Sequence, residues 1–126
     1  MIELVLDCRD PDGLARFWGA ALSYEVVDSS GSYRSLEPID GDDPGPALVL
    51  QAVHEPKVGK NRLHLDVVTS GSMEAEVARL VEAGAELVEV RQDPSSFDNP
   101  DTWTVMRDPE GNEFCVTSTS TLTGLD

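Results

Sequence analysis

The residues best suited to chemistry fall on two short stretches of alternating polar and apolar side chains, NRLHLDVV and EFCVTS. Strict alternation is typical of β-strands, because successive side chains point to opposite faces. His64 and Asp66 therefore share one face of the first stretch, and Glu113 and Cys115 share one face of the second. A histidine beside a carboxylate can act as a general base near neutral pH. The simpler interpretation is that His64 is only a structural histidine, hydrogen-bonded within the protein.

A third alternating stretch, WTVMRD, places Trp103 and Arg107 on one face. A guanidinium can hold a carboxylate or phosphate through two parallel hydrogen bonds, and an indole can stack on a flat or cationic ligand. Both residues are therefore candidates for ligand binding. The alternatives are structural: Arg107 forms an internal pair with Asp7, Asp66 or Glu113, and Trp103 fills the interior.

The elements that must position these side chains occur twice along the chain. Each half predicts the order strand, helix, strand, strand, strand. Asp10 and Pro11 predict the start of the first helix, while Ser72 caps the second and Gly84 ends it. The apolar stripes of the two helices recur at one constant offset: Leu14, Phe17 and Trp18 correspond to Val77, Leu80 and Val81.

This repeated order predicts an internal duplication within a single α+β domain of residues 1–126. We expect module one at 1–54, a connector at 55–60, module two at 61–118 and a polar, frayed tail at 119–126. Each four-stranded sheet is expected to cover its helix with one face. The other face is then free to curve around a ligand.

Composition restricts the partners and the location. The formal net charge of −15 argues against nucleic acids, whose affinity comes from basic side chains on phosphates, and against anionic membrane surfaces. The long-range field favours a cationic ligand, unless the acidity serves solubility alone. No apolar run approaches the roughly 20 residues that span a bilayer. Two cysteines make no disulfide framework, and the first residues lack signal-peptide features, so we expect a cytoplasmic protein.

Three stretches, DCRDPDGLARFWGAALSYEVV, KNRLHLDVV and WTVMRDPEGNEFCV, resemble the glyoxalase/bleomycin-resistance/extradiol dioxygenase superfamily, also called vicinal oxygen chelate proteins. The chain is most similar to short bacterial glyoxalase-like domain proteins, from Ile2 to about Ser118. The resemblance implies two βαβββ modules, a curved mixed sheet around a cavity, helices on the outer face and a homodimer. Many members of the superfamily bind a divalent metal in the cavity.

The resemblance also implies where metal ligands would lie, on the first and fourth strands of each module. These positions are Glu3, Gln51, His64 and Cys115. Cys115 departs from the family pattern, which has a glutamate there, and Glu113 lies roughly 7 Å away along the strand. A set of Glu3, His64 and Cys115 would suit zinc best. Because a buried cysteine is more simply a small core residue, we expect no metal.

Three classes of function remain open. The favoured one is a small-molecule-binding protein of the bleomycin-resistance kind, with catalysis unproven. A second is a metal-dependent lyase, isomerase or dioxygenase, in which His64 moves a proton. A third is a non-catalytic, dimeric interaction module. The expected ligand contacts are Trp103, Arg107, Asp66, Gln51 and Glu113, with His64 as the candidate catalytic residue.

Overall fold

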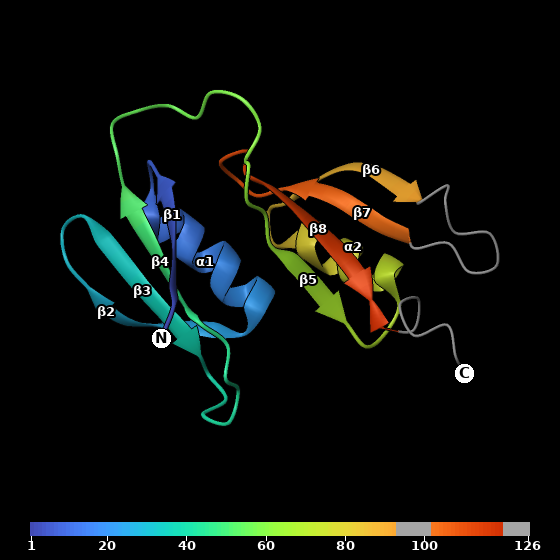
Figure 1. Ribbon diagram of the computed structural model, residues 1–126, viewed down its shortest axis with the longest axis horizontal. Helices are drawn as coiled ribbons and strands as arrows, with labels where there is room; N and C mark the ends of the chain where they lie inside the picture. Colours follow the sequence, from blue (N-terminus) through green and yellow to red (C-terminus); the bar gives the residue numbers. More distant parts are fainter. Residues whose placement is uncertain (93–101, 120–126) are drawn as a thin grey trace. The chain divides into compact units, whose positions relative to one another are not determined.

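The structure is a computed structural model that describes residues 1–92 and 102–119. The sequence also predicts a loop at residues 93–101 from its proline, serine and aspartate content. That loop and the predicted tail from residue 120 onward lie outside the described residues. The chain divides into two compact units, Met1–Val58 and Gly59–Asp126 (Figure 1). The predicted single domain of residues 1–126 stays a prediction.

Each unit contains one helix and one four-stranded sheet. The first contains β1 (Glu3–Cys8), α1 (Pro11–Leu22), β2 (Tyr24–Ser29), β3 (Tyr33–Pro38) and β4 (Ala47–Ala52). The second contains β5 (Asp66–Thr69), α2 (Met73–Glu82), β6 (Glu86–Gln92), β7 (Thr102–Arg107) and β8 (Glu113–Ser118). This order confirms the predicted α+β fold of two βαβββ modules.

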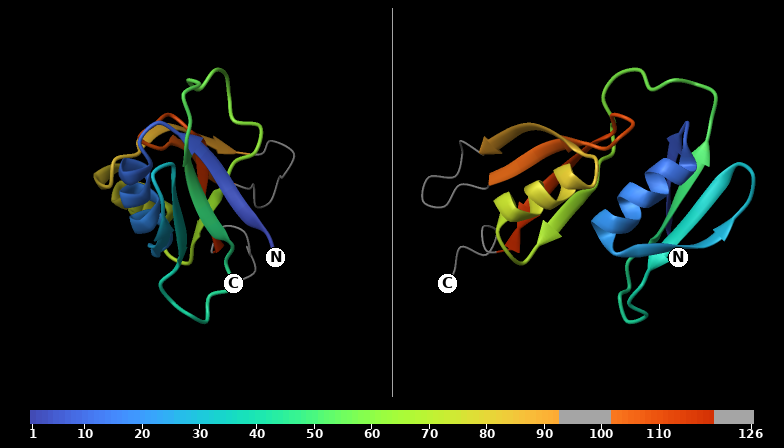
Figure 2. Two further views of the ribbon diagram at one scale, coloured as in Figure 1. Left: turned by 90° about the vertical axis from the view of Figure 1, so that its left-hand side faces the viewer. Right: turned by 180° about the vertical axis from the view of Figure 1, so that it is seen from behind.

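The two sheets have the same topology, with strand orders β1-β4-β3-β2 and β5-β8-β7-β6. In each sheet the first and fourth strands pair in parallel, and the other neighbours are antiparallel. Each helix packs on one face of its own sheet (Figure 2). The opposite face of each sheet is therefore free of helix.

The strand predicted to begin at residue 61 begins instead at Asp66. The prediction was wrong for residues 61–65, although Leu65 still accepts a backbone hydrogen bond from Cys115. The backbone N–H of Asn61 donates to the Glu113 carboxylate at 3.0 Å rather than to a strand carbonyl. This side-chain contact replaces ladder pairing at the start of the stretch.

Helix α1 begins as predicted. The Asp10 carboxylate caps it by accepting from the Gly13 backbone N–H at 3.1 Å, and Pro11 occupies its first turn. The helix ends at Leu22 and is capped by Ser23, which has a left-handed φ of 57° and donates its backbone N–H to the Gly19 carbonyl. The buried face contains Leu14, Ala15, Phe17, Trp18 and Ala21.

Helix α2 also has the predicted ends. The Ser72 hydroxyl accepts from the Ala75 backbone N–H at 3.1 Å, and Gly84 follows the helix with a φ of 121°. Leu80 is fully buried, but Val81 is 45% exposed. The predicted position of Val81 in the apolar stripe was wrong, because its side chain lies outside the buried side of the helix.

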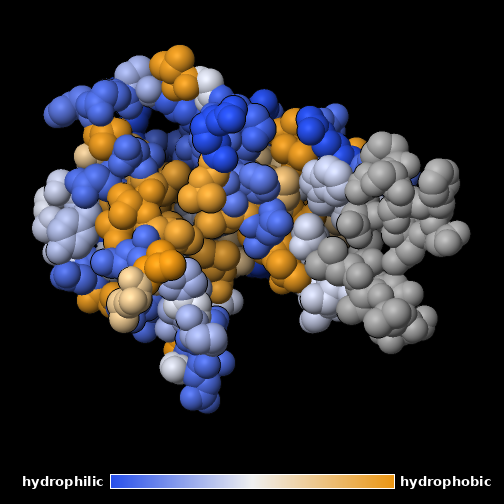
Figure 3. All heavy atoms as spheres, in the orientation of Figure 1, coloured by the Kyte–Doolittle hydropathy of each residue, from blue (hydrophilic) through white to orange (hydrophobic). Residues whose placement is uncertain are grey.

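The helix-free face of the first sheet carries apolar side chains over β1 and β4 (Figure 3). Val5 and Val49, which are paired in register, belong to this face, and Val5 is exposed. None of the helices in the described ranges is long and apolar enough to cross a membrane.

Candidate functional site

A cavity of about 470 Å³ lies within the second unit. Its volume falls in the range of about 300–1,000 Å³ that is usual for small-molecule sites. The walls combine apolar and polar side chains from all four strands and from the segment before β5. The lining residues are Lys60, His64, Asp66, Arg91, Thr102, Trp103, Val105, Glu113, Phe114, Cys115 and Thr117.

Strand register brings the central side chains of the cavity together. Asp66 on β5 lies opposite Cys115 on β8, and Val105 on β7 lies opposite Cys115 on its other side. Arg91 on β6 lies opposite Trp103 on β7. On β5, β7 and β8 the residues that alternate with them, such as Val67, Met106 and Val116, form the buried core, so the cavity side chains occupy the helix-free face. The cavity thus extends across the whole width of the second sheet.

His64, Asp66 and Cys115 form a cluster of three possible metal ligands, whose ligand atoms all lie within 4.8 Å of one another. His64 Nε2 lies 3.3 Å from Asp66 Oδ1, and the two side chains are 42% and 51% exposed. Cys115 is buried. Desolvation raises the pKa of the Cys115 thiol, and the nearby Asp66 charge raises it further, against smaller opposing effects of Lys60 and Arg91.

The chemistry and spacing of this cluster fit a divalent zinc-like ion. Zinc takes imidazole nitrogen, carboxylate oxygen and thiolate sulfur, and a tetrahedral ion holds its nitrogen and oxygen ligands roughly 3.3 Å apart. The His64 and Asp66 atoms already have this separation. Cys115 would have to lose its proton on binding, which its raised pKa opposes.

Trp103 and Glu113, both predicted to contact a ligand, line the cavity. One Glu113 carboxylate oxygen accepts from the Asn61 backbone N–H, so the side chain is anchored at the wall. Arg107 is not among the lining residues. Its guanidinium pairs with Glu86 at 3.1 Å, a partner that the sequence interpretation did not name. The proposed ligand contact of Arg107 stays a prediction.

Glu3 and Gln51, the other predicted ligands, belong to the first unit. Gln51 on β4 lies opposite Asp7 on β1, and its amide donates to the Ser32 carbonyl at 3.2 Å. Glu3 is exposed near the start of β1. Within the second unit, the predicted ligands His64 and Cys115 lie close to each other and to Asp66.

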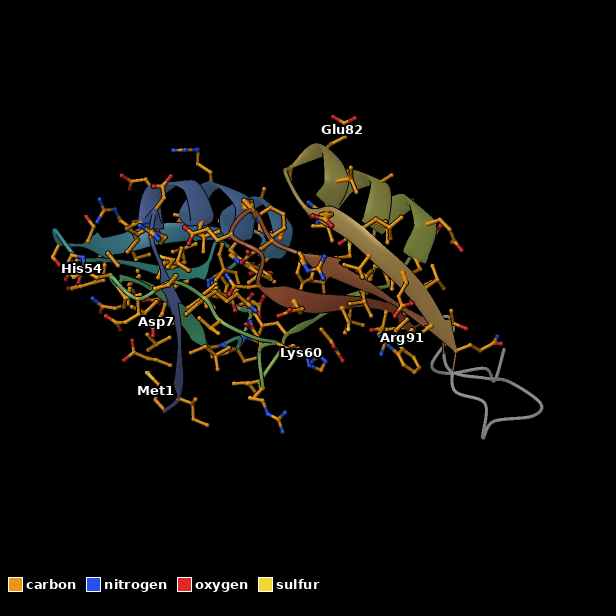
Figure 4. All side chains as sticks on the ribbon, turned by 90° about the horizontal axis from the view of Figure 1, so that it is seen from above. Met1, Asp7, His54, Lys60, Glu82 and Arg91 are labelled. Atoms are coloured by element: carbon orange, nitrogen blue, oxygen red, sulfur yellow. The ribbon has the colours of Figure 1, made fainter. Side chains whose placement is uncertain are left out.

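The sequence interpretation missed Lys60 and Arg91 as cavity residues. Figure 4 shows both on the side of the second sheet opposite α2, the helix that Glu82 marks. Arg91 could have been found if β6 had been paired with β7, because Arg91 then lies opposite Trp103. Lys60 has no such signal, since it precedes the strand in a segment that reads as a connector.

Thr117 is the remaining feature of the wall. It is only 9% exposed, and its hydroxyl oxygen is buried without a hydrogen-bond partner in the described part of the chain. Leaving such a group unpaired costs about 1–3 kcal/mol. Sequence alternation places Thr117 on the same face as Glu113 and Cys115, but only the packed structure reveals the unpaired hydroxyl.

Comparisons with known proteins agree with this architecture. The family described as Glyoxalase-like domain matches residues 3–117. No curated protein matches the chain. Among solved structures, a glyoxalase/bleomycin resistance protein/dioxygenase family enzyme from Burkholderia phytofirmans PsJN has a TM-score of 0.70 at 20% identity, covering 92% of this chain and 95% of that chain.

Two further structures share the fold. A genomically encoded fosfomycin resistance protein from Listeria monocytogenes, in complex with Mn(II) and 1S,2S-dihydroxypropylphosphonic acid, has a TM-score of 0.71 at 14% identity, covering 93% of this chain and 87% of that chain. A glyoxalase-related enzyme from Fulvimarina pelagi has a TM-score of 0.65 at 17% identity, covering 94% and 88%. Because the family model matches most of its length, the chain belongs to the glyoxalase-like domain family.

Proposed function

We propose that this protein binds a small organic molecule in the cavity of its second unit. The observation that carries the proposal is the wall of this cavity, where Trp103 and Val105 offer apolar surface beside the polar groups of His64, Asp66 and Glu113. Small-molecule sites typically combine an apolar lining with a few polar groups that fix orientation. The cavity volume of about 470 Å³ accommodates a compact ligand.

Thermal shift measurements against a small-molecule collection test this proposal. Ligands that raise the melting temperature of the wild-type protein should raise it much less in Trp103→Ala and His64→Ala, because both variants remove cavity wall. Glu82→Ala, on the exposed end of α2, serves as the control. Equal shifts in all four proteins would place the ligand elsewhere and contradict the proposal.

Arg107→Ala separates the structural interpretation from the one based on sequence. Arg107 pairs with Glu86 outside the cavity lining, so this substitution should leave ligand-induced shifts unchanged. Loss of the shift in Arg107→Ala as well as in Trp103→Ala would instead favour the shared face that alternation alone predicts.

A second candidate function is that of a metal-dependent lyase, isomerase or dioxygenase. The cluster of His64, Asp66 and Cys115 favours it, because three different donor groups converge at one cavity wall. A divalent metal held there would polarise an oxygen atom of the substrate. In that case His64 and Asp66 contribute ligands rather than a free general base.

Cobalt titration tests this second function without requiring a known substrate. A thiolate bound to Co²⁺ gives an intense near-ultraviolet absorption band, which should be absent in Cys115→Ser and weakened in Asp66→Asn. Uptake should increase with pH, because the Cys115 thiol must release its proton. Glu3→Gln tests the ligand implied by resemblance. No band at any pH in the wild type would remove the metal-dependent function.

We also propose a homodimer in the cytoplasm. The family resemblance supports the dimer, and two buried cysteines that are not joined in a disulfide suit a reducing compartment. Light scattering across a concentration series tests the assembly. A constant monomer mass would contradict both the dimer and the alternative of a dimeric interaction module.

A further inference from the structure

Thr117 and Ser118, consecutive residues of β8, differ in the hydrogen bonding of their hydroxyl groups. Ser118 donates to the Gly71 carbonyl at 2.7 Å, which ties the strand to the segment before α2. Thr117 lines the cavity, and its hydroxyl oxygen has no partner in the described residues. Buried polar groups in folded proteins are nearly always hydrogen-bonded, so an unpaired one calls for a missing partner. Because Thr117 lines the cavity, a molecule bound there can supply that partner.

The Thr117 hydroxyl is able to meet a ligand. A hydroxyl both donates and accepts, so it can bond an oxygen or a nitrogen atom of a bound molecule. Rotation about χ1 moves the oxygen between staggered positions, two of which are common in strands. The hydroxyl is therefore an adaptable contact on an otherwise rigid strand.

The charged side chains around the cavity differ in their polar partners. Asp66 lies beside His64, and Glu113 accepts from the Asn61 backbone N–H. Arg91 is paired with Glu89.

Lys60 is the exception. Its ammonium group donates to the Asn61 carbonyl at 3.3 Å, and it makes no ion pair with any residue of the described ranges. Lys60 is thus the positive charge of the cavity wall that has no carboxylate partner. The positive charge of Lys60 also acts on the Cys115 thiol, in the middle of the sheet, and opposes the rise of its pKa.

These contacts indicate a ligand class. A carboxylate, phosphate or similar anionic group would form an ion pair with Lys60, and a flat apolar body would lie against Trp103 and Val105. The net charge of −15 by itself favours a cationic ligand. The cavity differs from that average because its carboxylates already have polar partners, whereas its lysine has no carboxylate partner in the described ranges.

We propose that the cavity binds an organic anion with a flat apolar body, whose charged group meets Lys60 and whose polar atoms bond the Thr117 hydroxyl. This inference rests on the proposed small-molecule function and names the class of ligand for that cavity.

Three probes with one ring and different charge test the class of ligand: benzoate, benzamide and benzylammonium. Each is titrated into the full-length, ¹⁵N-labelled protein up to about 50 mM, a range that reveals weak binding. The chain has two tryptophans, and the indole signal of Trp103 reports the cavity while that of Trp18 serves as the internal control. We expect benzoate to bind about fivefold more tightly than benzamide, and benzylammonium to bind least.

Matched lysine variants identify the charge that matters. Lys60→Gln should remove the preference for benzoate over benzamide. Lys57→Gln makes the same change of charge in the first unit and should keep the preference. A preference that survives in Lys60→Gln, or a preference for benzylammonium in the wild type, would overturn the inference.

Variants of Thr117 separate ligand binding from structure. Thr117→Val keeps the shape and removes the hydroxyl, so it should weaken benzoate about threefold without lowering the melting temperature. Thr117→Ser should restore the affinity, and Ser118→Ala should lower the melting temperature because it breaks the bond to Gly71. Unchanged benzoate affinity in Thr117→Val would overturn the role of the hydroxyl.

The probe titrations distinguish failure of the small-molecule function from failure of the proposed class of ligand. If none of the three probes shifts the Trp103 indole signal, the small-molecule function of the cavity fails. If all three bind with equal affinity, that function stands and the proposed class of ligand fails.

Discussion

The two units share one topology but bury different kinds of side chain. The buried residues of the first unit are all apolar, and the largest are Phe17 and Trp18. Every buried polar residue in the described part of the chain belongs to the second unit: Thr104, Asp108, Asn112, Thr117 and Ser118. Because buried polar groups cost free energy unless they are paired, such positions must serve a turn, a packing contact or a ligand.

The helices show the same difference. Helix α1 buries five residues against its sheet, whereas α2 buries Met73 and Leu80. Both units also contain a bulge between their second and third strands, at Val26/Asp28 and at Leu87/Glu89. The two units therefore share backbone geometry, while their buried side chains differ. The second unit carries the described cavity together with the buried polar side chains.

The largest expected effect tests this difference at equivalent helix positions. Trp18→Ala should lower the free energy of unfolding by about 3–5 kcal/mol, because it leaves a cavity and removes an edge contact with Phe17 at 5.1 Å. Val81→Ala, at the corresponding position of α2, should change it by less than about 0.5 kcal/mol. Urea denaturation followed by circular dichroism measures both values. Similar losses would show that the helices are packed alike.

A smaller effect is expected in the turns between the third and fourth strands. The buried Asp108 carboxylate accepts from the Glu110 and Asn112 backbone N–H groups and from the Asn112 amide. Asp108→Ala leaves these donors unpaired, and should cost about 2–3 kcal/mol. Asp40 accepts from Asp42 at an exposed turn of the first unit, so Asp40→Ala should cost less than about 0.5 kcal/mol.

The Asp108 prediction is checked by the same urea series. Asn112→Ala is a second probe of the network, because it removes the amide but keeps the backbone donor. A loss for Asp40→Ala as large as that for Asp108→Ala would mean that burial does not distinguish the two turns.

The smallest effect concerns the acid dependence of stability. The hydrogen bond from Arg79, together with the charge of Arg79, lowers the pKa of Glu76, which lies on the partly buried side of α2. A carboxyl group with a lowered pKa contributes stability above its unfolded pKa, and this contribution disappears as the pH falls through its folded pKa. Glu76→Gln should therefore cost about 0.5 kcal/mol at neutral pH and nothing in acid.

The matched pair in the first unit is Asp12 with Arg34. The pKa of Asp12 is lowered by the Arg34 hydrogen bond and charge, but its side chain is 62% exposed against 15% for Glu76, so Asp12→Asn should have the weaker effect of the two. Unfolding free energies measured between pH 7 and pH 3 compare the two variants. A larger acid dependence from Asp12 would reverse the expected order.

Much of the architecture could be predicted because its signals are local. Asp10 and Ser72 cap their helices through contacts within one turn, and alternation identifies most strands. The prediction failed at residues 61–65, where a contact between Asn61 and the distant Glu113 replaces strand pairing. It also failed at Val81, because helical periodicity does not reveal how much of a helix its sheet covers.

The candidate site could be predicted only in part. His64, Asp66, Trp103, Glu113 and Cys115 stood out by their residue types and shared faces, and the structure places all five at one cavity. Their common location depends on which strands are neighbours. Alternation along a single strand cannot supply that information.

The sequence by itself determined the repeated order of elements, the helix ends and the family, because these depend on neighbouring residues and on motifs such as RDPEGNEF. Only the tertiary structure decided that Asp66 lies opposite Cys115, that Arg107 pairs with Glu86, and that Lys60 lines the cavity. The physical reason is that strand register and side-chain burial arise from packing between segments that are far apart in the chain. An unpaired hydroxyl such as that of Thr117 exists only once those segments have closed around it.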